Sequence, residues 1–324
     1  MNSTLAGVTE DSARSAAPPA AKPLTITLAT LVRREFWEHR YLWIAPVVVE
    51  AVLIVLGAIV GHGNVHLPND TDFSGWPNLQ AQKVAAFTIL QWMLSVPACV
   101  VLVGVVSWYA LDCLYAERRD RSILFWKSLP VSDGLTVLSK ALVAMLGAPL
   151  VSYVVALVGF LVFAGILALR VAAGGVPSVF SWDLLEWFRT ELVMLILLVV
   201  AVLWYAPVVA AMMLLSVWAR PNPFLWAFLA PIVAPLLERI ALGTHYLSSF
   251  LHYRAFDIWG TLAYGPAHGH INIITHHGLH PIGTLLDEFN IGAALTDIDL
   301  WLGVAASAVM LYAATRIRRY RDDT

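Results

Sequence analysis

The stretch AERRDRSILFWKSLPVSDGLTVLSK, residues 116–140, is a charged segment that lies between two long apolar runs of the chain. It carries Arg118, Arg119 and Arg121 together with bulky apolar residues such as Phe125 and Trp126. So many charges in a short stretch do not fit the hydrocarbon core of a bilayer, whereas the runs on either side do. The segment is therefore expected to link two membrane spans on one side of the membrane.

The composition of the whole chain supports a membrane protein. Of the 324 residues, 59% are hydrophobic and only 13% are charged, whereas soluble domains are about 45–50% apolar and about 25% charged. A helix needs about 20 apolar residues to cross a bilayer. Six stretches qualify, and they lie at roughly 43–61, 84–112, 138–168, 189–218, 223–240 and 298–315. The fifth contains Pro231 and Pro235, so we expect it to be short or broken.

The distribution of basic residues predicts the orientation. With the N-terminus in the cytoplasm, 15 of the 20 Lys and Arg residues fall on the cytoplasmic side and five on the other. This bias is typical of cytoplasmic loops. Both termini are then cytoplasmic, in the plasma (inner) membrane of a bacterium, and residues 113–137 form a cytoplasmic loop.

The sequence predicts an all-α chain with one membrane domain and short flanking pieces. These are a disordered cytoplasmic tail (1–22), an interfacial amphipathic helix (23–42), a six-span domain (43–316) that includes an external helical segment (241–297), and a cytoplasmic tail (317–324).

The segment before the first span has helical periodicity but too many charges to cross the membrane. In LTITLATLVRREFWEHRYL, residues 24–42, apolar residues recur every three or four positions. Such a pattern favours a helix lying along the membrane surface, although a cytoplasmic extension of the first span is an alternative. Arg34 and Glu38 are four residues apart and are expected to pair on the wet face.

Within the charged loop, residues 117–129 can form a short amphipathic helix. Phe125 and Leu129 are four residues apart and belong to one broad apolar face. Pro130 limits this helix, and Ser132 or Asp133 can cap the next one. The charged face is expected to face water, while the apolar face needs a partner, either another protein or the rest of this bundle.

The sequence ERRDRSILFWKSLPVS resembles the cytoplasmic loop of ABC-2 type transporter permeases. The matching positions are Glu117, Leu124, Ser128, Leu129, Pro130, Val131 and Ser132. The stretch LVRREFWEHR is similar to the interfacial helix of that family. Family members often carry Gly-Thr near the middle of the loop helix, where this chain has Arg121-Ser122, so this part of the match is imperfect.

The resemblance implies that residues 117–129 form a coupling helix that sits in a groove of a separate ABC ATPase subunit. It also implies a homodimer of six-span permeases working as an exporter. The coupling residues would be Glu117, Arg118, Arg121, Ile123, Leu124, Phe125, Trp126, Leu129 and Pro130. ATP and Mg²⁺ would bind the partner subunit, because this chain contains no GxxxxGK[ST] phosphate-binding sequence. The chain itself is then expected to be no enzyme, and no nucleic acid is expected among its partners.

Two other features leave alternative functions open. Glu50 lies inside the first span, and an intramembrane carboxyl group is a candidate functional site, here for an ion-coupled secondary transporter, unless it is structural. The external segment contains His268, His270, His276, His277 and His280. Imidazoles bind zinc and copper, so a membrane-embedded metal protein or enzyme is an alternative to the interpretation in which these histidines cap helices, bond backbone groups or face water. The sequence does not identify a substrate.

Overall fold

The computed structural model describes residues 24–60, 79–120, 131–173, 184–219, 222–258 and 291–320, and these residues contain helices and no strand. Six helical segments are long and apolar enough to cross a membrane. They are α2 (Tyr41–Val60), α3 (Leu79–Asp112), the continuous segment Asp133–Ala172, α8 (Leu184–Trp218), α9 (Pro223–Leu242) and α14 (Ile298–Tyr320). This confirms the prediction of an all-helical chain with six such helices.

The third of these segments has three parts: α6 (Asp133–Leu142), the π-helix η3 (Val143–Gly147) and α7 (Ala148–Ala172). Ser132 caps α6, because its Oγ accepts a hydrogen bond from the backbone N–H of Leu135 at 3.3 Å. This confirms one of the two caps that the sequence allowed. The ring of Phe36 lies against η3, and a Cβ atom on Gly147 would lie only 2.8 Å from it.

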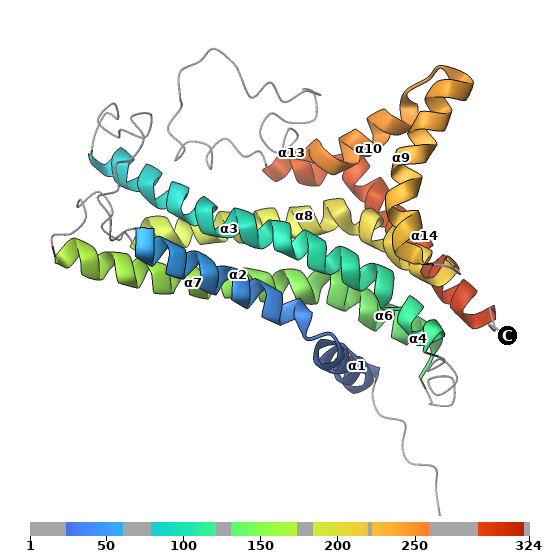
Figure 1. Cartoon of the computed structure of the whole chain (residues 1–324), viewed down its shortest axis with the longest axis horizontal. Coiled ribbons are helices and arrows are strands. Elements are labelled where there is room, and N and C mark those ends of the chain that lie inside the picture. Colours follow the sequence, from blue (N-terminus) through green and yellow to red (C-terminus); the bar gives the residue numbers. More distant parts are fainter. Residues whose placement is uncertain are drawn as a thin grey trace, which may run out of the picture.

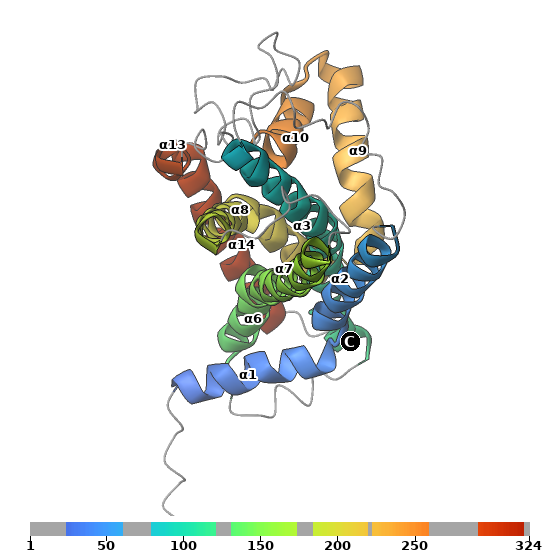
Figure 2. The same ribbon diagram turned by 90° about the vertical axis from the view of Figure 1, so that its left-hand side faces the viewer.

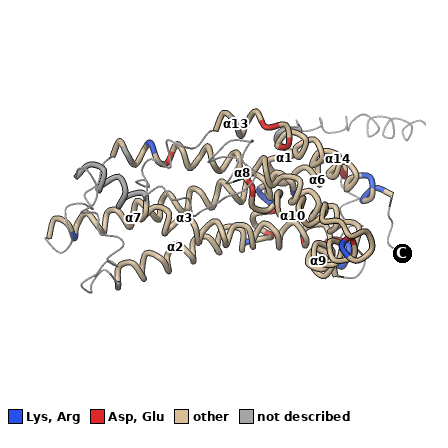
Figure 3. Tube along the Cα trace, turned by 90° about the horizontal axis from the view of Figure 1, so that it is seen from above, with Lys and Arg blue, Asp and Glu red and all other residues tan. Residues whose placement is uncertain are grey.

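The long helices α2, α3, α7 and α8 lie side by side, and α14 packs along α8 (Figure 1). Helix α1 (Leu24–Glu38) runs across one end of this bundle (Figure 2). Charged residues gather where α1, α6 and α14 meet, whereas much of the length of α2, α3 and α7 carries none (Figure 3). The largest buried apolar cluster lies at the same end and includes Leu42, Tyr109, Val137, Met213 and Ala314.

Helix α9 stands apart from the other spans (Figure 1). Among the residues of α9, Pro223 at the start of the helix is buried. Asn222 caps the helix by accepting from the N–H of Phe224 at 3.1 Å, and Gly243 ends it with a left-handed φ of 67°. Because α9 runs unbroken through Pro231 and Pro235, the expectation of a short or broken fifth span is wrong. Membrane helices tolerate proline when the freed backbone groups find other partners.

Among the described residues, α10 (Tyr246–Phe256) and α13 (Ile291–Thr296) lie between α9 and α14 in the chain. Arg254 attaches α10 to the bundle, because its guanidinium lies 4.5 Å from the ring centroid of Trp204. The indole Nε1 of Trp204 also donates to the backbone oxygen of Arg254 at 3.0 Å. A Cβ atom at Gly303 of α14 would collide with this guanidinium, so the arginine in its present position packs against a glycine.

Candidate functional site

The charged segment starts in a buried network of ion pairs. Helix α4 (Tyr115–Arg119) follows α3, and its residue Glu117 is only 8% exposed. One carboxylate oxygen of Glu117 lies 2.5 Å from Nη1 of Arg318 in α14, and the other lies 3.2 Å from Nζ of Lys140 in α6. Arg318 also contacts Asp133, at 3.0 Å from Nε to Oδ1. A single acidic residue therefore connects α4 to two of the membrane-spanning segments.

Lys140 extends the network to α1. Its Nζ lies 2.9 and 3.0 Å from the two carboxylate oxygens of Glu35, and the hydroxyl of Tyr109 donates to the same carboxylate at 3.0 Å. Lys140 is 1% exposed and Glu35 is 2% exposed. The lysine thus bridges two buried carboxylates, Glu35 from α1 and Glu117 from α4. We refer to Glu35, Glu117, Asp133, Lys140 and Arg318 as the ion-pair network.

A second set of contacts holds α4 against α8. Nη2 of Arg118 donates to the backbone oxygens of Ser216 and Ala219, at 2.6 and 2.8 Å. In return, Oγ of Ser216 accepts from the N–H of Tyr115 at 2.9 Å. Carbonyls at a helix C-terminus and N–H groups at a helix N-terminus lack partners within their own helix. Side chains at each helix end therefore supply hydrogen-bond partners for backbone groups at the other, and α4 is fixed to the end of α8.

The network joins elements without necessarily adding much stability. Burying charges carries a desolvation penalty that often cancels their mutual attraction, whereas removing one partner from a buried pair is strongly destabilising. Its five side chains come from α1, α4, α6 and α14. A displacement of α4 would separate these charges unless the attached helices moved with it.

His39 borders the network, just after α1. Its Nε2 lies 3.6 Å from a carboxylate oxygen of Glu35, and its ring packs edge-on against the ring of Tyr109. Burial lowers the pKa of His39, although the nearby carboxylate of Glu35 works in the opposite direction. His39 is therefore held as a largely neutral imidazole around neutral pH.

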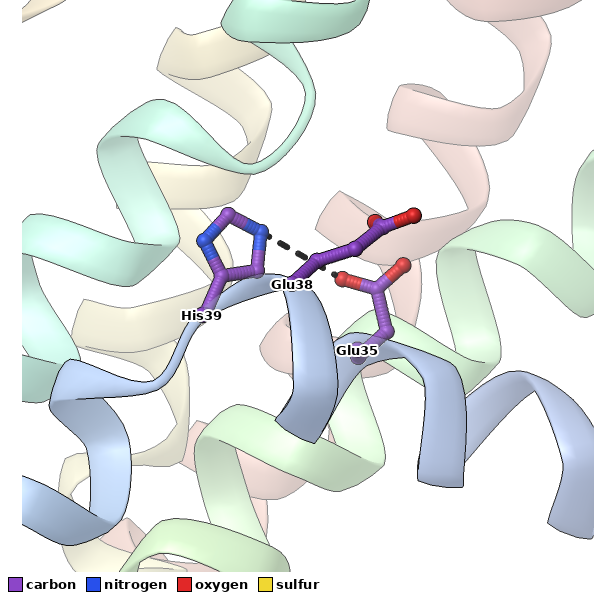
Figure 4. Close-up of side chains that lie close together, drawn as sticks. All are labelled: Glu35, Glu38 and His39. Carbon is purple, nitrogen blue, oxygen red and sulfur yellow. Dashed lines mark ion pairs between the residues drawn. The ribbon is translucent and has the colours of Figure 1, made fainter.

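Glu35, Glu38 and His39 bring three possible metal ligands together (Figure 4), with one ligand atom from each lying within 4.8 Å of the others. The Glu35 carboxylate, however, already pairs with Lys140 and accepts from Tyr109. Glu38 is exposed and pairs with Arg34 at 2.7 Å, as the sequence predicted. The two acids therefore already have partners within the chain, and this cluster is better described as part of the network's border than as a metal centre.

Two acidic side chains are buried in the spans away from the network. Glu50 of α2 is 3% exposed, and neither carboxylate oxygen has a hydrogen-bond partner among the described residues. It packs against Gly159 of α7, where a Cβ atom would lie 2.7 Å from Oε2 of Glu50. Glu191 of α8 contacts Gln91 of α3 and Tyr153 of α7.

The structure describes only part of the predicted site. Glu117 and Arg118 contact other elements of this chain, which differs from the expectation that the charged face of the segment faces water. The remaining coupling candidates, Arg121, Ile123, Leu124, Phe125, Trp126, Leu129 and Pro130, lie outside the described residues. So do the histidines proposed as metal ligands, His268, His270, His276, His277 and His280.

Sequence reasoning missed Glu35, Lys140 and Arg318 as members of a buried site, although their spacing contains a signal. Glu35 follows Leu28 and Val32 by seven and three residues, which places it on the apolar stripe of α1. Lys140 likewise follows the buried Val137 by three residues, and Arg318 follows the buried Ala314 by four. A charged residue on an apolar stripe indicates a buried partner, but not which one.

Comparisons with known proteins give no independent assignment, since no protein-family model matches the chain and no curated protein or solved structure matches it either.

Proposed function

We propose that this chain is the membrane subunit of an ATP-binding cassette exporter of the ABC-2 type, driven by a separate ATPase subunit. In this proposal the ATPase docks on residues 117–129 and supplies the ATP and Mg²⁺ sites. Two copies of the chain form the translocation path in a bacterial inner membrane, with both termini in the cytoplasm. The six apolar helices and the resemblance of ERRDRSILFWKSLPVS support this function.

The observation that carries the proposal is the position of Glu117. It is the first residue of the expected coupling helix, and it pairs with Lys140 and Arg318, which belong to two different spanning segments. Arg118, the next residue, binds the end of a third. A push on the segment would therefore reach α6, α8 and α14 through short polar contacts, as a subunit that receives mechanical work requires.

Docking is tested by co-expressing the chain with an ABC ATPase subunit from the same organism. Trp126→Asp and Phe125→Asp should abolish co-purification of the ATPase, because a carboxylate on the apolar face opposes burial in a groove. Arg119→Ala is the matched control, since Arg119 is exposed and its ion pair is with its neighbour Asp120. If both aspartate variants retain the ATPase as the wild type does, residues 117–129 are not the docking helix.

Coupling is tested separately from docking. Glu117→Gln keeps the shape of the side chain but removes its charge, so the ATPase should still co-purify. We expect ATP hydrolysis by the reconstituted complex to lose its dependence on the membrane subunit, because α4 is no longer held by both cations. An unchanged hydrolysis rate in Glu117→Gln would show that the network does not transmit the motion.

A second candidate function is an ion-coupled secondary transporter, and the burial of Glu50 favours it. A carboxyl group with no described hydrogen-bond partner in the middle of a span is expected to carry a function. In that case transport would run on an ion gradient without ATP and would stop in Glu50→Gln. ATP-dependent transport that survives Glu50→Gln would reject this alternative.

A further inference from the structure

We infer that Gln91, Tyr153 and Glu191 form a binding site for a protonated amine between α3, α7 and α8. The inference goes beyond the proposed function and does not depend on it, because the site belongs to this chain alone and can be tested without an ATPase. It assigns a ligand chemistry, an ammonium group with N–H donors, to a buried carboxyl group.

The three side chains meet from three different helices. Nε2 of Gln91 donates to Oε1 of Glu191 at 2.9 Å. The hydroxyl of Tyr153 lies 3.1 Å from Oε2 of Glu191 and 3.0 Å from the backbone oxygen of the same residue. Gln91 is 2% exposed and Glu191 is 7% exposed, while Trp187, one turn earlier on α8, lies beside the same carboxyl group.

Hydrogen-bond accounting indicates that Glu191 is neutral when no ligand is bound. The Tyr153 hydroxyl has a single proton, but it lies within hydrogen-bond distance of two Glu191 oxygens. If Glu191 is protonated at Oε2, that proton is donated to the Tyr153 oxygen, and the Tyr153 proton is donated to the backbone oxygen. Both short contacts are then full hydrogen bonds, whereas with an ionised Glu191 the single Tyr153 proton must be shared between two acceptors.

The charge balance around Glu191 differs from that of the ion-pair network. There, each buried carboxylate faces a lysine or an arginine. Among the described residues no Lys, Arg or His forms an ion pair with Glu191, and Oε1 of Gln91 is a buried acceptor without a donor. The site therefore has excess acceptors and no cation, so an ammonium group supplies what it lacks.

The position of Gln91 along α3 puts the site near the membrane boundary opposite the network. Gln91 lies 18 residues before Tyr109 on α3, which corresponds to about 27 Å along the helix. The hydrocarbon core of a bilayer is about 30 Å thick, so a bilayer with one boundary at the network has its other boundary near Gln91. Glu50 lies only nine residues after Tyr41, or about 14 Å along α2, and is therefore deep in the bilayer.

Binding would exchange one cation for another. The ammonium donates N–H bonds to the Glu191 carboxylate and to Oε1 of Gln91, and the carboxyl proton of Glu191 leaves for water. Charge is conserved at the site, because one ammonium enters and one proton departs. Tyr153 keeps its proton and stabilises the carboxylate by donating to it.

The experiment uses the purified chain in lipid nanodiscs with three probes of equal chain length. Octylammonium has both charge and N–H donors, octyltrimethylammonium has charge without donors, and octanol has neither. Proton release is followed with a pH-indicator dye, and infrared difference spectra report the loss of the carbonyl stretch of a protonated carboxyl group. We expect octylammonium to release up to one proton per chain and the other two probes to release none.

Matched variants locate the effect. Glu191→Gln preserves the hydrogen bonds but should lose both the proton release and the infrared band. Tyr153→Phe should weaken octylammonium binding roughly tenfold, the effect of one lost hydrogen bond to a charged group. Ser307→Ala should behave as the wild type, because the Ser307 hydroxyl donates to the backbone oxygen of Gly303 within α14 and belongs to none of the proposed sites. The inference is overturned if wild-type protein releases no proton with octylammonium, if the three probes act alike, or if Glu191→Gln leaves the signals unchanged.

Discussion

At the scale of single residues, Lys140 is a buried cation that depends on its acidic neighbours. Its ammonium group is fully buried between the carboxylates of Glu35 and Glu117. A lysine in such a position is tolerated because both neighbours compensate its charge. The same contacts make each acid dependent on the lysine, so the site fails as a unit when one member is removed.

We therefore predict that Lys140→Met lowers the stability of the bundle by about 3–5 kcal/mol, because two carboxylates are left buried without their common cation. The melting temperature of the purified protein in detergent provides the measurement. Combining Lys140→Met with Glu35→Gln should be less damaging than the sum of the single changes. Additive effects would contradict the network, and Arg119→Ala serves as the exposed control.

His39 gives a prediction about pH. Burial holds its pKa below the ordinary value of about 6.5, so the unfolded chain binds a proton at His39 before the folded chain does. The stability that depends on neutral His39 is complete above pH 6.5 and is lost as the pH falls through the folded pKa. Between pH 7.5 and pH 5.5 the wild type should lose more thermal stability than His39→Asn. An equal loss in both proteins would show that His39 does not titrate in this way.

At the scale of helices, the contact between α2 and α7 depends on the absence of a side chain at Gly159. A Cβ atom there would lie 2.7 Å from Oε2 and 3.2 Å from Cδ of Glu50. Gly165, on the same helix, has nothing within 4 Å of the position of a Cβ atom. The two glycines thus differ in packing although both lie in α7.

This difference predicts opposite outcomes for the same substitution. Gly159→Ala should lower the melting temperature, because the methyl group would collide with the buried Glu50 carboxyl group and displace it. Gly165→Ala should leave the melting temperature unchanged or raise it, because alanine is the better helix former. Glu50→Ala should relieve part of the Gly159→Ala effect by removing the colliding carboxyl group. Equal effects of the two glycine substitutions would contradict the close contact.

Much of the helical architecture could be predicted from the sequence because apolar length alone marks a span. The site could be predicted only in part, since periodicity places Glu35 on an apolar stripe but cannot identify Lys140, which is 105 residues away, as its partner. For α9, the prolines predicted a break that the structure does not contain. The tendency of proline to break a helix does not decide the structure of a membrane span, because the bilayer favours a helix whose backbone groups have hydrogen-bond partners.

At the scale of the whole molecule, the six apolar helices and the bias of basic residues predict which parts face each side of the membrane. Arg119 at the end of α4 and Tyr246 at the start of α10 are both exposed. The predicted orientation places Arg119 in the cytoplasm and Tyr246 on the opposite side. A membrane-impermeant maleimide applied to intact cells should therefore label Tyr246→Cys, and should label Arg119→Cys only after permeabilisation.

The protein used in this labelling experiment first needs one native cysteine replaced. Cys113 is buried, whereas Cys99 is exposed and is best replaced by alanine. Labelling of Arg119→Cys in intact cells would show that the orientation is opposite to the predicted one. Residues 117–129 would then lie on the side that a cytoplasmic ATPase cannot reach.

The π-helix η3 has a consequence for how the third spanning segment can deform. Below it, α6 is anchored by Lys140 and Asp133, and above it, α7 packs along α2. A π-turn is built from i→i+5 hydrogen bonds and contains more residues than an α-turn. A change of η3 between π and α hydrogen bonding would therefore rotate α7 relative to α6 about their common axis, while α6 remains attached to its charged anchors.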